Sequence, residues 1–364
     1  MTRIIELLIA LVLVAVIFVV VGLVLPSHQH VSQTTETNRP LPVVFDMLNG
    51  FKRFKDWNSV HTMDPKAQFS LSGADSGPGA RVDYSSDNRL VGNGSWQIAS
   101  VKPGEQIVYS VSNGDYGDNK TMTFDFKRTG NQLLAVEITQ TYDVDYGFNL
   151  FGRYAGLYVS RSIGDVMKGS LANLSTFLAT VPKFDYTQLV SAPKIVKVPA
   201  ENLLVAPTKA KRANDEVESA MLVQEKWLHQ VMEKNGLEAS GPLRIVTINY
   251  GADVYEFSVA IPVRKAGETT PADAAPPQLT VTIDGDKNPV QYVQTKPVSA
   301  ITTSYAGHMA QLPAIREAMK AWGVTHGYDV DGHPYSNYTK GIAQSFTTDG
   351  AFDIYWPIKA QDAK

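Results

Sequence analysis

The C-terminal half of the chain carries one pattern twice. Segments 257–263 (FSVAIPV) and 352–358 (FDIYWPI) each begin with Phe and close with an apolar-Pro-apolar triplet. Each follows an apolar-faced stretch that contains a Trp, then a Gly, then a turn with Gly and Pro. These features are Trp227, Gly236 and Gly241-Pro242 in the first copy and Trp322, Gly327 and Gly332-His333-Pro334 in the second. Four matches in the same order indicate a duplication and predict two strand-helix-strand-strand units related by a pseudo-twofold axis.

Composition limits the classes of function. The 364 residues are 44% hydrophobic and 19% charged, which is ordinary for globular protein and allows about two domains. A net charge of -3 without a Lys/Arg cluster argues against nucleic-acid binding. The chain has no cysteine, so it has no disulfide or thiolate metal ligand. No phosphate loop, dinucleotide fingerprint or nucleophile elbow is present, so we expect no cofactor. The pair His28 and His30 lacks a third ligand, so we expect no metal.

The amino terminus is an almost unbroken apolar run from Leu7 to Leu25. About 20 apolar residues in a helix match the hydrocarbon thickness of a bilayer, so residues 4–25 are predicted to span a membrane. The alternative is a cleaved signal peptide, whose apolar region is usually shorter and ends in a small-x-small site. Because Arg3 precedes the run and no Lys or Arg follows until Arg39, the positive-inside rule predicts a single-pass inner-membrane protein with extracytoplasmic domains, which would be periplasmic in a Gram-negative organism.

Residues 27–182 are predicted to form the first globular domain. A strand from Val31 to Thr37 and a short helix from Val43 to Asn49 precede a series of alternating segments typical of antiparallel hairpins. Apolar residues recur every three or four positions over 161–178, which predicts a long helix at the end of the domain. The predicted hairpin strands are 81–85, 94–101, 106–111, 120–127 and 132–142.

This domain resembles the START-like, polyketide cyclase-like superfamily with its helix-grip fold. The resemblance lies in the segment 39–49, in Trp57-Asn58, in the turn 77–79 and in the strand 94–98 with Trp96. It implies a curved antiparallel sheet around the long helix, with an apolar cavity between them for a lipid or polycyclic compound. Trp57 and Trp96 are therefore candidate ligand contacts. None of these motifs is a catalytic signature.

After a Pro-interrupted linker at 183–194, residues 195–360 form the predicted duplicated domain, and segment 266–277 is expected to be a flexible surface connection between its two units. The second unit looks like the gyrase-inhibitor-like effector-binding domain of bacterial multidrug-sensing regulators. The resemblance lies in segments 305–308, 312–313, 321–322 and 332–335, in Gly327 and in the closing strand 352–358. It implies a small-molecule pocket at the pseudo-twofold seam. Regulators with this module carry a DNA-binding domain in front, which this chain replaces with an apolar segment and a START-like domain.

Candidate ligand contacts follow from this resemblance. Relatives often carry a Glu four residues before the strand's Pro, facing the pocket, and this chain has Asp353 there. Alternation along a strand would bring Tyr355 to the same side, and Glu256 and Ser258 in the first copy. A partly buried carboxylate with aromatic rings suits an organic cation or a planar compound. The alternatives are a solvent-facing Asp353 and core packing for Trp322 and Trp356. Tyr305 and Tyr335 are the remaining candidate ligand contacts in this domain.

The sequence leaves three functions open. The first is a membrane-anchored protein that binds a hydrophobic or cationic small molecule, such as a lipid, for sensing, sequestration or transfer. The second is a cyclase- or hydrolase-type enzyme, in which Asp353 or Glu256 would act as a base with a raised proton affinity. The third is an envelope scaffold whose cavities are filled by side chains. Catalysis would be lost in Asp353→Asn or Glu256→Gln, whereas binding of neutral ligands would survive both changes.

Overall fold

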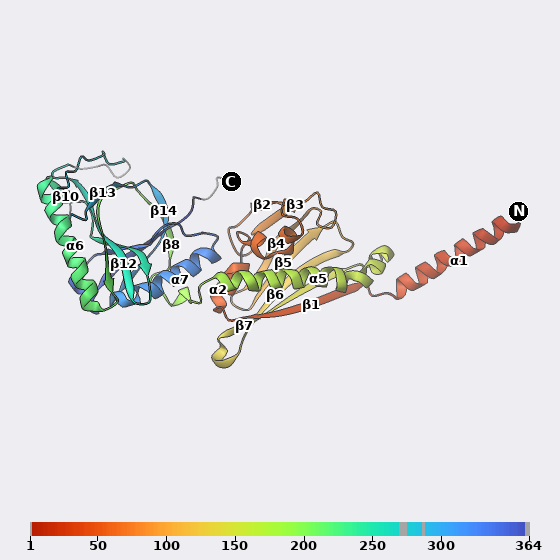
Figure 1. Ribbon diagram of the computed structural model, residues 1–364. Helices are drawn as coiled ribbons and strands as arrows, with labels where there is room; N and C mark the ends of the chain where they lie inside the picture. Colours follow the sequence, from red (N-terminus) through yellow and green to blue (C-terminus); the bar gives the residue numbers. More distant parts are fainter. Residues whose placement is uncertain (1, 269–274, 286–287, 361–364) are drawn as a thin grey trace. The chain divides into compact units, whose positions relative to one another are not determined.

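The computed structural model describes residues 2–268, 275–285 and 288–360. The chain divides into two compact units: unit 1 comprises Met1–Lys183 with Thr325–Gly327, and unit 2 comprises Phe184–Val324 with Tyr328–Lys364. Each unit has its own antiparallel sheet covered by helices, and an apolar helix leads into unit 1 (Figure 1). The predicted α+β class is confirmed. Part of the expected surface connection, residues 269–274, lies outside the described residues.

Helix α1 (Thr2–Val24) is the apolar helix at the amino terminus. Its segment Arg3–Val24 has 22 residues and is almost entirely exposed. At the usual rise per residue it is about 33 Å long, which matches the hydrocarbon core of a bilayer. Length and composition of this kind are shared by membrane anchors and signal sequences.

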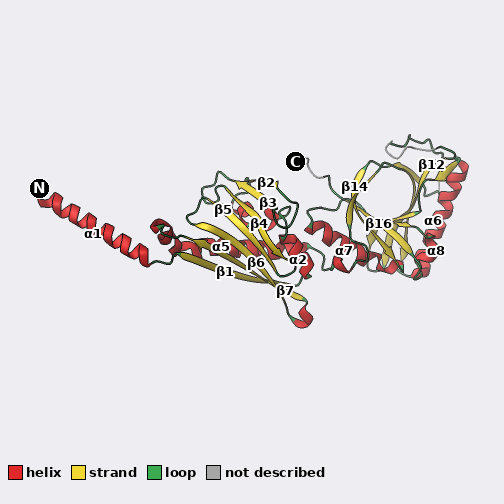
Figure 2. Cartoon of the chain, turned by 180° about the vertical axis from the view of Figure 1, so that it is seen from behind, coloured by secondary structure: helices red, strands yellow, loops and turns green. Residues whose placement is uncertain are grey.

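Seven strands form the sheet of unit 1 in the order β1-β7-β6-β5-β4-β3-β2 (Figure 2). Strands β2 to β7 pair with their neighbours in sequence, whereas β1 pairs with β7, from His28↔Asp145 to Thr37↔Val136. Burial alternates along β7, so one face of the sheet is buried and the other is partly solvated. The strands are β1 His28–Thr37, β2 Gln68–Ser72, β3 Arg81–Ser85, β4 Gly94–Lys102, β5 Gln106–Asn113, β6 Asp118–Thr129 and β7 Ala135–Asp145.

The long helix α5 (Leu150–Thr180) lies along one face of this sheet (Figure 1). Met167, Leu171, Leu174 and Leu178 are buried on its inner side at three- and four-residue spacing, which is the pattern that predicted the helix. The shorter helices of unit 1 are α2 Leu41–Leu48, α3 Phe54–Trp57, α4 Ser59–Met63 and η1 Asn131–Leu133.

Helix α5 begins 11 residues before the predicted start at 161. Its first turns contain Gly152 and Gly156, which lower helix propensity and therefore concealed the helix. Both glycines lie against the ring of Tyr146, where a Cβ atom would come within 2.8 Å of a ring carbon. The Asn149 side chain caps the helix by accepting a hydrogen bond from the Gly152 amide at 3.0 Å.

Two histidines of β1 face two aspartates of β7 on the exposed side of unit 1. His28 Nδ1 lies 2.8 Å from Asp145 Oδ1, and His30 Nδ1 lies 2.7 Å from Asp143 Oδ1. The hydrogen bond to Asp145 is the main cause that raises the pKa of His28. The same bond is the main cause that lowers the pKa of Asp145.

We expect an NMR titration of the full chain to give His28 a pKa above 6.5, and Asp145→Asn to lower that pKa. The ion pair of His28 and Asp145 contributes its full share to the free energy of unfolding between about pH 4 and pH 6.5, because both groups are charged there even in the unfolded chain. It is lost as the pH rises through the folded pKa of His28, or falls through that of Asp145. A His28 pKa that does not respond to Asp145→Asn contradicts this assignment.

The strands of unit 2 form a nine-stranded curved sheet whose main path runs β13-β9-β12-β11-β15-β16-β14-β8, while β10 pairs with β12 (Figure 2). The order β9-β12-β11 of the first half mirrors the order β14-β16-β15 of the second, as the repeated sequence pattern predicted. The halves join where β11 pairs with β15, from Arg244↔Asn337 to Val246↔Tyr335. The strands are β8 Lys194–Val198, β9 Asn202–Lys211, β10 Leu237–Ala239, β11 Arg244–Tyr250, β12 Val254–Lys265, β13 Gln291–Gln294, β14 Val298–Ala306, β15 Tyr335–Tyr338 and β16 Ala351–Pro357.

Helices α6 (Asn214–Lys234) and α7 (Leu312–Thr325) cover one face of this sheet, with α6 in the first repeat and α7 in the second. Phe257 and Val259 of β12 and Phe352 and Ile354 of β16 face these helices and form the core with them. The helix residues of this core are Val217, Met221, Leu228, Val231 and Met232 of α6 and Leu312, Ile315 and Met319 of α7. The remaining helical segments are η2 Tyr186–Gln188, η3 Met309–Gln311 and α8 Gly341–Ser345.

Candidate functional site

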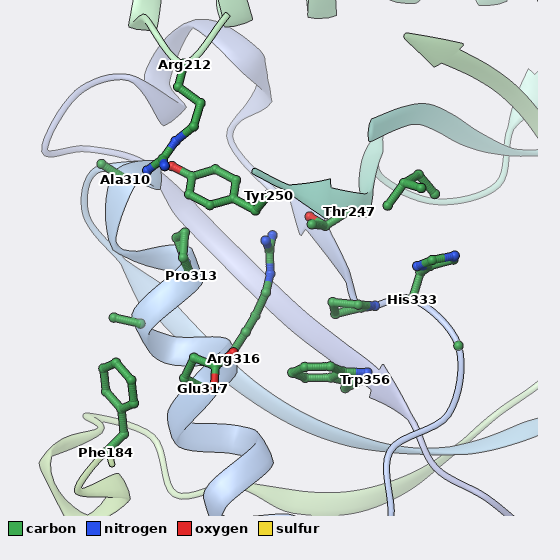
Figure 3. Close-up of a pocket in the computed structure, with 14 residues that line it drawn as sticks. Phe184, Arg212, Thr247, Tyr250, Ala310, Pro313, Arg316, Glu317, His333 and Trp356 are labelled. Carbon is green, nitrogen blue, oxygen red and sulfur yellow. The ribbon is translucent and has the colours of Figure 1, made fainter. Parts of the chain in front are cut away.

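A pocket of about 540 Å³ opens in unit 2 on the helix-covered side of the sheet. It lies at the seam of the two repeats, because Thr247 of β11, Pro334 beside β15 and Trp356 of β16 line it together with α7 (Figure 3). This volume falls in the range of small-molecule sites. Its lining is Phe184, Arg212, Thr247, Ile248, Tyr250, Ala310, Pro313, Ala314, Arg316, Glu317, Gly332, His333, Pro334 and Trp356.

Arg316 is the central charged group of the pocket. It stands on α7 and extends toward Thr247 and Tyr250 of β11 (Figure 3). Only 5% of the residue is exposed. One guanidinium nitrogen donates to Ser336 Oγ at 3.2 Å, whereas Nε is buried without a hydrogen-bond partner. Within the described ranges no carboxylate forms an ion pair with it. A buried cation without a counter-charge is costly, so this position favours an anion.

Three other polar groups lie around Arg316. Trp356 lines the pocket, and its Nε1 is also buried without a partner. The hydroxyls of Thr247 and Tyr255 are 2.8 Å apart. Burial is the main cause that raises the pKa of Tyr255, and the positive charge of Arg316 opposes it. The lining of the pocket therefore holds two unsatisfied N–H donors, on Arg316 and Trp356, and the hydroxyl of Thr247, which suit a ligand rich in acceptor oxygens.

The outer part of the pocket adds cations and an aromatic surface. The guanidinium of Arg212 lies 4.0 Å from the centre of the Tyr250 ring, and it donates to the carbonyls of Gly251 and Ala252. His333 is exposed at the edge of the pocket. Glu317 is the acidic residue of the lining. Two arginines against one glutamate give the lining a positive balance, and proline, alanine and aromatic side chains supply its apolar area.

The predicted ligand contacts of β15 and β16 lie on the opposite face of the sheet. Tyr335 and Tyr355 stack there, with ring centres 5.0 Å apart. The guanidinium of Arg244 lies 4.7 Å from the centre of the Tyr335 ring and forms a two-pronged ion pair with Glu201 at 2.7 and 3.1 Å. Burial is the main cause that raises the pKa of Tyr335 to about 12. Because Arg244 occupies the cation–π position on Tyr335, these groups bind one another.

The other predicted contacts of unit 2 are spread over both faces. Asp353 shares the face of Tyr355, where its Oδ1 accepts a hydrogen bond from Ser304 at 2.7 Å. Ser258 is buried on that face, and Glu256 is exposed near the start of β12. Tyr305 lies on the helix side, where its ring stacks on Phe352. The structure therefore brings Tyr335, Tyr355 and Asp353 onto the face of the sheet opposite the pocket beside α7, and their assignment as ligand contacts stays a prediction.

The predicted contacts of unit 1, Trp57 and Trp96, lie in its core. Their ring centres are 6.1 Å apart, and both rings meet that of Phe54 edge to face. Trp57 is 1% exposed and Trp96 is 6% exposed. Contacts of each tryptophan with other aromatic side chains extend this cluster to Tyr109 and Phe124. The two tryptophans pack in the core, and their assignment as ligand contacts stays a prediction.

Sequence reasoning missed Arg316, although a signal was present. The apolar residues Leu312, Ile315 and Met319 mark the inner face of α7, and Arg316 occupies the remaining i+4 position of that stripe. A charged residue at an inward-facing position indicates a special environment. His333 is exposed, and it also borders the pocket. In the part of the chain that the structure describes, no three His, Asp or Glu side chains group as a metal site.

No family model matches the chain, and no curated protein matches it. Among solved structures, the C-terminal domain of EcmrR is similar to 48% of this chain over its full length, at 13% identity and a TM-score of 0.35. A START superfamily protein from Mycobacterium smegmatis is similar to 41% of this chain over 97% of its own length, at 16% identity and a TM-score of 0.31. A hydrolase from Listeria innocua matches 46% of this chain at 13% identity and a TM-score of 0.31. Such low scores carry no argument about function.

Proposed function

We propose that this protein is a membrane-anchored receptor or carrier for a small anionic molecule with an apolar or aromatic body. Unit 2 binds the molecule in the pocket of about 540 Å³ beside α7. The carboxylate or phosphate of the ligand meets Arg316, and the body of the ligand lies against Pro313, Tyr250 and Trp356. Helix α1 anchors the chain in a membrane, and the positive-inside rule places both units on the side away from Arg3.

The observation that carries this proposal is the buried guanidinium of Arg316, which has no carboxylate partner among the described residues. Folding removes most of its hydration, and no described carboxylate compensates the charge, so the charge is unfavourable without a bound anion. An anionic ligand would offset this cost, and its oxygens could accept from Nε, which has no protein partner. For the cationic ligand that the sequence predicts, the described lining of this pocket offers one carboxylate, that of Glu317, whereas Asp353 lies on the other face of the sheet.

The proposal is tested on the full chain in lipid nanodiscs by calorimetric titration with naphthoate, naphthylmethanol and naphthylmethylammonium. These probes share one aromatic body and differ in the charge of the head group. We expect naphthoate to bind at least about tenfold more tightly than the neutral and cationic probes, because a charge-assisted hydrogen bond contributes roughly 1.5–3 kcal/mol. Equal or tighter binding of the cation would support the earlier expectation, and binding of none of the three would support a scaffold.

Arg316→Gln should weaken naphthoate binding by about 10- to 100-fold, corresponding to roughly 1.4–2.7 kcal/mol, and should abolish the preference over naphthylmethanol. The same change removes an uncompensated buried charge, so the unfolding free energy of the ligand-free protein should not fall. Arg264→Gln is the matched control, because Arg264 pairs with Glu238 on an exposed edge of unit 2. A variant that loses stability while keeping the charge preference would show that Arg316 is structural only.

A further inference from the structure

The start of α5 carries apolar side chains that unit 1 leaves exposed to solvent. Phe148 is 89% exposed, Phe151 67% and Tyr158 70%. Between Tyr146 and Gly164 there is no acidic residue, and the charged residues are Arg153 and Arg161. Large exposed apolar patches of this kind indicate contact with a protein or a membrane.

These side chains lie beside the C-terminal end of α1. The ring of Phe18 stacks on Tyr154 at 4.6 Å and lies 5.5 Å from the ring of Phe151. Tyr154 also donates its hydroxyl hydrogen to the carbonyl of Phe18 at 2.8 Å. Gly22 permits this close approach, because a Cβ there would lie 3.0 Å from Leu150 Cδ2. Figure 1 shows the first turns of α5 next to the end of α1.

Arg153 joins the two helices through the backbone. Its Nη1 donates to the carbonyls of Gly22, Leu23 and Leu25 at 3.3, 2.9 and 3.1 Å, and its Nε and Nη2 donate to the carbonyl of Gly147. The last carbonyls of a helix lack intrahelical partners, and a cation there is favoured by the helix dipole. The guanidinium is thus satisfied without water, as a group at the edge of a bilayer requires.

We infer that residues 148–158 form a second membrane contact, which lies in the interface of the bilayer that α1 spans. Phe18 lies six residues before Val24, so it is about 9 Å deeper along α1. A side chain that contacts Phe18 must lie at a similar depth, within the last turns of the span. Aromatic residues favour this interfacial region, and Arg161, one turn further along α5, suits anionic head groups. The inference rests on the anchor in the proposed function, but not on the ligand of unit 2.

Single-cysteine labelling tests the depth of this segment, because the natural chain has no cysteine. The full chain is reconstituted in vesicles of phosphatidylcholine and phosphatidylglycerol with a nitrobenzoxadiazole label at Phe151→Cys, Tyr158→Cys, Val12→Cys or Leu90→Cys. Quenching is measured with aqueous iodide and with lipids brominated in the acyl chain. Leu90 is the matched control, since it is an apolar residue of unit 1 that is 82% exposed and far along the chain from α5.

We expect the Phe151 label to be quenched by brominated lipid and several-fold less by iodide than the Leu90 label. The Tyr158 label should be intermediate, because it lies two turns further from the end of α1. If Val12 is shielded while Phe151 is as accessible to iodide as Leu90, the inference is wrong and the anchor stands. If Val12 itself is open to iodide, both the anchor and this inference are wrong. Unchanged circular dichroism confirms that each labelled variant is folded.

Discussion

Replacement of Trp57 by alanine is expected to lower the free energy of unfolding of unit 1 by about 3–5 kcal/mol, the usual cost of truncating a large buried aromatic side chain. Trp57 is 1% exposed and its ring meets those of Phe54, Trp96 and Phe124 edge to face. Removal of the indole therefore leaves a cavity and breaks three aromatic contacts. Trp57→Phe should cost less, because it retains most of the ring and removes an N–H group that is buried without a partner.

Chemical denaturation of the full chain in detergent, followed by far-ultraviolet circular dichroism, measures this loss. Leu90→Ala is the control for a large-to-small change at an exposed position of the same unit, and its effect should stay within about 0.5 kcal/mol. If Trp57 instead lined an open ligand cavity, Trp57→Ala would cost less than about 1 kcal/mol and would change the binding of apolar probes. That result would restore the cavity implied by the START-like resemblance.

Glu201→Gln is expected to destabilise unit 2 by about 3 kcal/mol, the low end of the range for breaking a buried ion pair. Arg244 is 5% exposed and is held by both carboxylate oxygens of Glu201. The variant would leave the guanidinium buried with only the Tyr335 ring and a neutral amide beside it. The Glu201 side chain is 25% exposed, so water can enter beside the guanidinium of Arg244 in the variant. This hydration lessens the loss of stability.

The matched control is Glu238→Gln, which breaks the exposed ion pair between Glu238 and Arg264 in the same unit. That change should alter the free energy of unfolding by less than about 1 kcal/mol, as is usual for surface pairs. Denaturation followed by tryptophan fluorescence measures this change, since three of the five tryptophans, Trp227, Trp322 and Trp356, lie in unit 2. Equal effects of the two variants would contradict the buried character of the Arg244 pair.

The two arginines of the second domain illustrate different uses of a buried cation. Arg244 has a carboxylate and an aromatic ring, so its charge is compensated within the protein. In the part of the chain that the structure describes, Arg316 has a serine hydroxyl but no carboxylate as a partner, and it borders a pocket. The first arrangement stabilises the fold, whereas the second leaves a charge for a ligand to compensate. Loss of Arg244's partner should therefore lower stability, and loss of Arg316 itself should lower affinity.

Several features of the fold followed from the sequence because they depend on local periodicity. The apolar run at 7–25 predicted α1, and the repeat of 257–263 at 352–358 predicted the mirrored halves of the second sheet. The apolar spacing over 161–178 predicted the inner face of α5 but not its first turns. In these first turns Gly152 and Gly156 lower the local helix propensity, whereas in the folded structure they leave space for the ring of Tyr146.

The sequence by itself determined the α+β class, the apolar amino-terminal helix and the duplication, because chain periodicity reports which residues share a side of an element. Only the tertiary structure revealed the pocket beside α7. Asp353 and Tyr355 alternate with Ile354 and Trp356 as predicted, and the pocket beside α7 opens on the side of Ile354 and Trp356. Whether a buried charge has a partner likewise depends on residues far apart in the chain, such as Arg316 and Ser336, and no local pattern encodes that distance.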